Sequence, residues 1–219
     1  MSEHQRRFVQ LAMTREALRF GDFKLKSGRQ SPYFFNAGRF NDGESLAVLG
    51  ECYAAALSAA AIDYDMLFGP AYKGIPLVAA TAIALARGAP QRNVPWAFNR
   101  KEAKEHGEAG QIVGTPLAGR VVIVDDVITA GTAVRESIEL IRQAGATPAA
   151  VLLALDREER GQGQLSAVQE VQANYGLQCV SIITLSGLIA TLERGGAAAL
   201  NDASLAAMRQ YRQEYGIAP

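Results

Sequence analysis

The hydrophobic residues of this chain fall into two alternating patterns. Short apolar runs rich in Val, Ile and Leu are typical of strands buried on both faces. Between them, apolar residues recur three and four positions apart, as on one face of a helix. This alternation predicts an α/β fold with a mostly parallel central sheet flanked by helices on both faces. The expected strands are 66–68, 94–98, 121–124, 149–155 and 179–184.

The helical segments complete the predicted element order. One region departs from it, because FKLKSGRQSPYFF alternates apolar and polar residues around a Ser-Gly-Arg turn and predicts a short antiparallel hairpin. Helices are expected over 3–20, 44–60, 75–85, 134–145, 168–175, 188–192 and 205–211.

Size and charge limit the classes of protein to consider. With 219 residues, 49% of them hydrophobic, the chain predicts a single domain over residues 1–219 with one well-filled core. Lys and Arg balance Asp and Glu at 22 each, so we expect no binding of nucleic acid or of an anionic membrane. Charges throughout residues 1–20 argue against a secretory signal, and cytoplasm is the expected compartment. Cys52 and Cys179 lie far apart and are expected to be free thiols.

The most informative stretch is VVIVDDVITAGTAVRE, residues 121–136. A buried strand runs into Asp125 and Asp126, and Thr-Ala-Gly-Thr (129–132) then leads into a helix. Such a loop can direct backbone N–H groups and hydroxyls at a phosphate. The carboxylates need partners, which a sugar diol and bound Mg²⁺ would supply. The alternative is a solvated acidic turn with threonine caps.

Two further loops follow expected strands, at 69–74 and 156–161. Parallel strands end at one edge of a sheet, so both loops should lie beside Asp125. Gly69, Pro70 and Gly74 are also consistent with a tight turn alone, whereas Lys73 favours an anion.

A long polar connection over 99–119 carries four basic or titratable side chains, Arg100, Lys101, Lys104 and His106. A mobile arm of this kind could close over an anionic ligand and neutralise its charge. A solvated charged loop is the alternative for each of these residues.

The acidic pair followed by TAGT resembles the phosphoribosyl-pyrophosphate motif of the type I phosphoribosyltransferases. Over nearly the whole chain, five segments resemble in order and spacing the orotate phosphoribosyltransferase family of the bacterial type: FGDFKLKSGRQSPYFFNAGRF, LFGPAYKGIP, FNRKEAKEHGEAG, VVIVDDVITAGTA and LDREERGQG.

This resemblance implies a reaction and an assembly. The phosphoribosyl group of 5-phospho-α-D-ribose 1-diphosphate (hereafter the donor) would pass to orotate, giving orotidine 5′-phosphate and diphosphate in pyrimidine nucleotide synthesis, with Mg²⁺ as cofactor. The chain would form a homodimer with shared active sites, Lys101 reaching into the partner's site. A hood would form mainly from residues 1–40 and C-terminal elements, and a mobile catalytic loop would span about 100–119.

The same resemblance assigns the site residues. Catalysis would involve Lys101, Lys104, His106, Asp125 and Asp126. Orotate would contact Lys26, Phe34, Phe35, Thr129 and Arg157. Mg²⁺ would be held mainly through donor oxygens, with Asp125 or Asp126 as the protein ligand, and Ala71-Tyr72 would be a cis peptide. The donor would contact Lys26, Tyr72, Lys73, Arg100, Lys101, Lys104, His106, Asp125, Asp126, Val127, Ile128, Thr129, Ala130, Gly131, Thr132 and Ala133.

Arg157 also has a physical argument, because its planar fork suits the carboxylate of orotate, although a salt bridge to Glu158 or Glu159 is the alternative.

Two other functions are alternatives. The first is a purine-specific phosphoribosyltransferase, but the set Lys26, Phe34, Phe35 and Arg157 favours an acidic pyrimidine. The second is a non-enzymatic sensor that binds the donor and regulates transcription, but the sequence shows neither a helix-turn-helix extension nor a basic surface.

Overall fold

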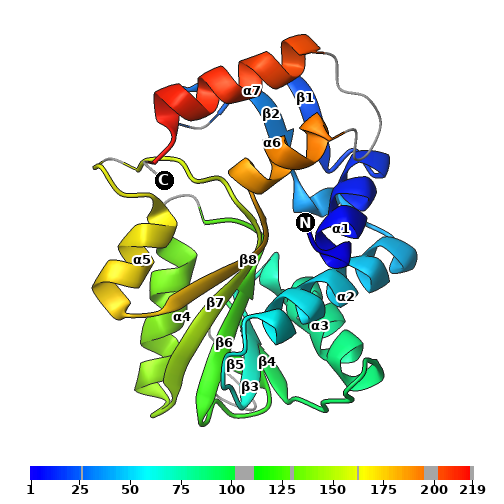
Figure 1. The fold of residues 1–219 in the computed structure, drawn as a ribbon. Helices are drawn as coiled ribbons and strands as arrows, with labels where there is room; N and C mark the ends of the chain where they lie inside the picture. The colour runs from blue at the N-terminus through cyan, green and yellow to red at the C-terminus, as the bar shows by residue number, and fades with distance from the viewer. Residues whose placement is uncertain (26, 102–110, 129–130, 162, 195–201, 218–219) are drawn as a thin grey trace.

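The computed structural model describes the chain except for residues 26, 102–110, 129–130, 162, 195–201 and 218–219 (Figure 1). A six-stranded sheet has the order β5-β4-β3-β6-β7-β8, and a separate two-stranded sheet contains β1 and β2. The strands are β1 (Leu18–Lys24), β2 (Gln30–Phe35), β3 (Met66–Gly69), β4 (Trp96–Asn99), β5 (Ile112–Gly114), β6 (Arg120–Asp125), β7 (Thr147–Asp156) and β8 (Gln178–Thr184).

Helices cover both faces of the large sheet (Figure 1). Those of one face, α2 and α3, share a hydrophobic core with Val122 and Val124. On the other face, α4 and α5 pack against Val121 and Ile123. The continuous apolar run of β6 is therefore explained by burial on both sides. The helices are α1 (Glu3–Thr14), α2 (Gly43–Ala59), α3 (Gly74–Arg87), α4 (Thr132–Gln143), α5 (Ala167–Tyr175), α6 (Leu185–Glu193) and α7 (Asp202–Tyr215).

The predicted α/β fold is confirmed, with β4, β3, β6, β7 and β8 mutually parallel. The hairpin is also present, since β1 and β2 pair antiparallel. It forms a hood with α7 above the sheet (Figure 1), where the rings of Tyr33 and Tyr211 meet edge to face at 6.1 Å.

The sequence prediction was wrong about the end of the first helix and about the segment after β4. The opening helix ends at Thr14 rather than near residue 20, because Glu16 adopts a φ of 53° and the chain then enters β1, where Leu18 pairs with Phe35. The connection after β4 is not all loop, because β5 adds an antiparallel strand beside β4 at the sheet edge.

No described helix is long and apolar enough to cross a membrane. Cys52 and Cys179 are both free thiols, as predicted, and burial raises the pKa of each to about 12. Both thiols are therefore protonated at neutral pH.

Candidate active site

The candidate site lies where the direction of the sheet changes. From β3 the chain continues outward to β4, whereas β6 continues to β7 and β8 on the other side. Parallel sheets bind ligands at such a switch point, beyond the carboxyl ends of the strands. The loops after β3, β6 and β7 all leave this edge, as the sequence predicted.

The loop after β3 is a very tight turn. A Cβ on Gly69 would lie 2.3 Å from the carbonyl oxygen of Gly74, and one on Gly74 would lie 2.6 Å from the ring of Pro70. Both glycines are therefore required by close backbone approach. The Ala71-Tyr72 peptide is cis, as the resemblance implied. The turn projects the side chains of Tyr72 and Lys73 outward, both exposed.

Asp125 is the last residue of β6 and Asp126 follows it, and both are buried, 8% and 4% exposed. Each carboxylate accepts a hydrogen bond from the next backbone N–H, at 2.8 Å for Asp126 N and 2.9 Å for Val127 N. Tyr53 of α2 donates its hydroxyl to the Asp125 carbonyl at 2.8 Å. A solvated acidic turn is thereby excluded.

Lys73 and Asp126 join the two loops. Lys73 Nζ lies 2.7 Å from Asp126 Oδ2. The ammonium group of this pair is exposed and the carboxylate is buried. The exposed lysine can leave this pair for a ligand phosphate, and the carboxylate would then need a hydroxyl or cation in its place.

Asp125 has an unusual protonation equilibrium. Burial, together with the negative charge of Asp126, raises the pKa of Asp125 to about 7. A ligand cation or hydroxyl donor would favour the ionised form. The pair is therefore prepared for a charged or hydroxylated ligand, which is typical of a functional site.

The amino end of α4 lies beside the acidic pair in the chain. It begins after Gly131, whose φ of +70° suits glycine, and Thr132 and Ala133 are exposed in its first turn. An exposed helix N-terminus offers backbone N–H groups to a phosphate. The side chains of Val127 and Ile128 pack against the two cores instead, so they could meet a ligand only through their backbone.

Sequence reasoning missed Asn99, at the end of β4. Its Oδ1 accepts the Ala71 N–H at 2.8 Å and so ties the β3 loop to the start of the basic segment. Two residues later, Lys101 Nζ lies 5.2 Å from the centre of the Tyr72 ring. A lone asparagine at a strand end gives no sequence pattern that identifies it.

Arg157 lies at the hood side of the site, 4.6 Å above the Tyr33 ring. It pairs with Glu159, whose Oε1 accepts from Nε at 2.8 Å. The predicted salt-bridge alternative is thus present here, with Glu159 rather than Glu158. Glu158 instead accepts the Ser186 N–H at 2.7 Å.

Phe34 and Phe35 point to opposite faces of β2. Phe34 stacks on Phe23 at 5.6 Å, whereas Phe35 is buried against Phe8. The side chain of Phe35 belongs to the core, so an orotate contact by this residue, which stays a prediction, would use its backbone.

Arg100 is half-buried, and its backbone N–H donates to the Gln111 carbonyl at 2.7 Å. The predicted roles of Lys26, Lys104, His106, Thr129 and Ala130 lie outside the described residues.

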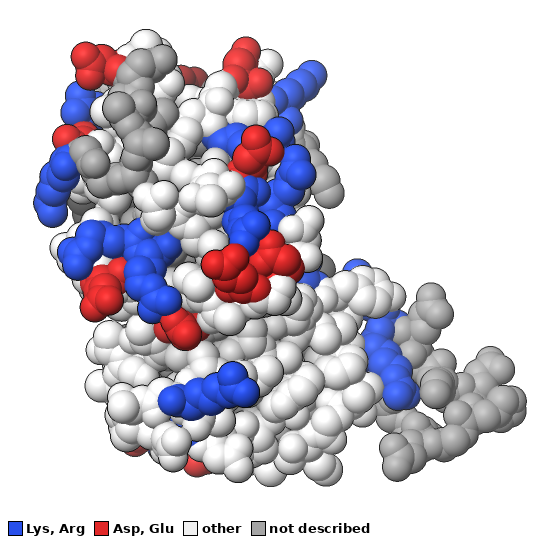
Figure 2. All heavy atoms as spheres, turned by 90° about the vertical axis from the view of Figure 1, so that its right-hand side faces the viewer, with Lys and Arg blue, Asp and Glu red and all other residues white. Residues whose placement is uncertain are grey.

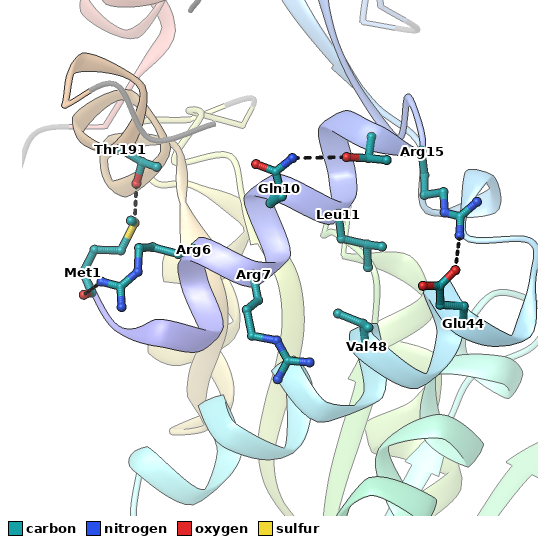
Figure 3. Close-up of a pocket in the computed structure, with 10 residues that line it drawn as sticks. Met1, Arg6, Arg7, Gln10, Leu11, Arg15, Glu44, Val48 and Thr191 are labelled. Carbon is teal, nitrogen blue, oxygen red and sulfur yellow. Dashed lines mark hydrogen bonds and ion pairs between the residues drawn. The ribbon is translucent and has the colours of Figure 1, made fainter. Parts of the chain in front are cut away.

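A separate groove between α1 and α2 carries three arginines, Arg6, Arg7 and Arg15 (Figure 3). Arg7 pairs with Glu51, and Arg15 pairs with Asp42 and Glu44. Arg6 donates to the Met1 carbonyl. No residue of the three loops lines the groove.

The acidic pair can serve Mg²⁺ only as part of its coordination shell. Among the described residues no three His, Cys, Asp or Glu side chains cluster as a metal site. Two adjacent carboxylates fit Mg²⁺, which typically takes one or two protein carboxylates and completes its shell with phosphate oxygens and water.

The switch-point site, with its buried acidic pair and exposed helix N-terminus, defines a class of α/β protein that binds a phosphorylated ligand. Residues 42–178 match the phosphoribosyl transferase domain family. Over 99% of the chain, it is 58% identical to the full length of the orotate phosphoribosyltransferase of Cronobacter sakazakii and 57% identical to that of Klebsiella pneumoniae. A crystal structure of the Francisella tularensis orotate phosphoribosyltransferase, 38% identical, superposes with a TM-score of 0.85 over 95% of this chain and 98% of that one. The chain therefore belongs to the phosphoribosyltransferase family, and within it to the orotate phosphoribosyltransferases.

Proposed function

We propose that this protein transfers the phosphoribosyl group from the donor to orotate, giving orotidine 5′-phosphate and diphosphate for pyrimidine nucleotide synthesis. The observation that carries the proposal is the Lys73–Asp126 pair, which joins the β3 and β6 loops at the switch point. A buried carboxylate for ribose hydroxyls and an exposed cation for pyrophosphate lie there in contact, as a ligand with both groups requires. The identity to orotate phosphoribosyltransferases supports the choice of base.

The proposed division of labour follows from these positions. Asp125 and Asp126 would accept the ribose hydroxyls, and the first turn of α4 with the 127–133 loop would bind the 5′-phosphate. Tyr72, Lys73, Arg100 and Lys101, with Lys104 and His106, would bind the pyrophosphate. The bond between the anomeric carbon and the pyrophosphate oxygen breaks as the orotate nitrogen, having lost its proton, bonds to that carbon. The protein would act by holding both reactants in line and stabilising the departing charge.

Mg²⁺ is the proposed cofactor, with Asp125 or Asp126 as its protein ligand beside the donor oxygens. When bound, it would neutralise charge on the pyrophosphate. The orotate end would be formed by Lys26, Phe34, the backbone of Phe35, Thr129 and Arg157. Arg157 is the arginine of this set. Its planar guanidinium suits the carboxylate that distinguishes orotate from uracil.

A homodimer is supported by the outer surface of α3. Pro76, Ala79, Ile83 and Ala86 form one apolar stripe, with Ile83 57% exposed. Figure 2 shows few charged side chains on the lower part of this side of the molecule. We propose that α3 packs against a second copy of the chain.

The cytoplasm is the proposed compartment. Two free cysteines are consistent with a reducing compartment.

Mixing the protein with orotate, the donor and Mg²⁺ should deplete orotate absorbance in proportion to diphosphate released. Turnover of a purine base without orotate turnover would instead identify a purine-specific enzyme. Donor binding without turnover of any base would favour a sensor.

Asn99→Ala should lower kcat/KM by roughly tenfold to a hundredfold, because the β3 loop loses the acceptor that orients Tyr72 and Lys73. The donor KM should rise while the orotate KM changes little, as measured by steady-state kinetics. Asn99→Asp, which keeps the acceptor oxygen, should retain more activity. Equal losses in both variants would contradict a positioning role for the Asn99 oxygen.

A further inference from the structure

A cluster of charged and aromatic side chains surrounds Arg157 beyond the end of β7. Glu159 Oε1 accepts from Arg157 Nε at 2.8 Å, and Glu159 Oε2 lies 3.6 Å from Arg29 Nη1. The Tyr33 hydroxyl donates to Glu159 Oε1 at 3.4 Å. Arg157 and Glu159 are only 12% and 14% exposed. Glu159 is therefore held from three sides.

Arg157 keeps donor capacity beyond its ion pair with Glu159. Its Nη2 is buried and lies 2.6 Å from Glu159 Oε1, but no N–H of this nitrogen is aligned in a hydrogen bond with a described residue. A buried guanidinium nitrogen without a hydrogen bond is costly unless a ligand completes it. Glu159 thus satisfies the Nε side of the guanidinium and leaves donor capacity on the terminal nitrogens.

The charges of the cluster agree with an anionic ligand. Arg29 and Arg157 carry two positive charges, and Glu159 compensates one of them. One positive charge remains, which a single carboxylate would neutralise. If Glu159 instead occupied the place of the substrate carboxylate, substrate binding would break its contacts with Arg157, Arg29 and Tyr33. The loss of these contacts would oppose binding.

We propose that Glu159 is a positioning residue for orotate. It holds the Nε edge of Arg157, so that the remaining N–H groups of the guanidinium face the carboxylate of the base. Arg29 and Tyr33 hold Glu159 in turn, which links the hood to the substrate-binding arginine. The inference rests on the proposed function of Arg157.

The neighbouring carboxylate provides a matched control. The Glu158 carboxylate binds the N–H and hydroxyl of Ser186 at the start of α6, whereas the carboxylate that pairs with the Arg157 guanidinium is Glu159. Loss of Glu158 should weaken the α6 cap and lower thermal stability. It should leave the relative KM values of the two substrates unchanged.

Steady-state kinetics of Arg157→Ala, Glu159→Gln, Glu159→Ala, Glu158→Gln and the Arg157→Ala/Glu159→Ala double variant would test the proposal. Glu159→Ala should raise the orotate KM roughly tenfold with little change in the donor KM, since a mobile guanidinium must be ordered on binding. Glu159→Gln keeps an acceptor oxygen and should show a smaller rise. In the Arg157→Ala background, Glu159→Ala should add almost nothing, because its effect passes through Arg157.

Each other outcome has a defined meaning. An unchanged or lower orotate KM in both Glu159 variants would overturn the proposal, as would equal rises for the two substrates or full additivity in the double variant. If Arg157→Ala itself leaves the orotate KM unchanged, the assignment of Arg157 fails and the role of Glu159 fails with it. If Glu159→Ala unfolds, Glu159→Gln still decides the question, with thermal unfolding as the check on folding.

Discussion

Replacing Asp125 and Asp126 together by Asn is expected to lower kcat/KM by about a thousandfold while the protein remains folded. Asparagine keeps the shape and one acceptor oxygen, so the backbone hydrogen bonds to Asp126 and Val127 N–H can persist. What is lost is the negative charge that we propose meets the ribose hydroxyls and Mg²⁺. Steady-state kinetics and circular dichroism would measure the two effects separately. Asp22→Asn, an exposed change in β1, is the matched control. An unfolded double variant would contradict the catalytic interpretation.

The single variant Asp125→Asn has a further consequence for stability. In the folded, ligand-free protein the pKa of Asp125 is raised from 3.8 to about 7, first by burial and then by Asp126. Between these values the unfolded chain has released this proton while the folded chain keeps it, so the Asp125 contribution lowers stability as pH rises. Above about pH 7 the penalty is complete. Asp125→Asn should therefore raise the free energy of unfolding at pH 8 by up to about 4 kcal/mol, and not at pH 4.

Urea unfolding of both proteins at the two pH values, without donor or Mg²⁺, would measure this difference. A gain in stability with a loss of activity would show that the buried carboxylate is retained for function at a cost to the fold. A gain of equal size at pH 4 would contradict protonation as the cause.

The second large effect is recovery of activity from two inactive chains. In the single chain Lys101 lies over its own Tyr72, whereas the family resemblance implies that it serves the partner's site. If it acts across a dimer, a heterodimer of Lys101→Ala and Arg157→Ala chains contains one site with both residues intact. An equal mixture, half of whose dimers are mixed, should regain about a quarter of wild-type activity.

Orotate turnover after mixing and re-equilibration would measure the recovery. Adding Ile83→Glu to both chains should abolish it, because a carboxylate would then lie in the apolar stripe of α3, and analytical ultracentrifugation should show smaller particles. If mixed dimers are present by mass spectrometry and no activity returns, Lys101 serves its own chain.

Much of this protein could be predicted from local patterns. The parallel sheet followed from apolar runs such as 121–124, which are buried on both faces. The edge of the sheet that carries the site could be predicted from the acidic, glycine-rich and basic residues directly after the strands, because parallel strands end at the same edge. The first helix was extended too far, since residues 15–20 fit a helical period locally but Leu18 is fixed by pairing with Phe35. Residue periodicity cannot distinguish these outcomes over so short a segment.

The sequence by itself determined the class of fold, the edge of the sheet that carries the site and the residue types available there. Only the tertiary structure decided which of those residues meet. Lys73 contacts Asp126 across 53 positions, and the Asn99 side chain binds the Ala71 N–H across 28. The side chain of Phe35 is assigned to the core, and Glu159 rather than Glu158 holds Arg157. These are contacts between strand ends and loops brought together by packing, and their geometry depends on the relative placement of whole elements, which no local pattern of residues contains.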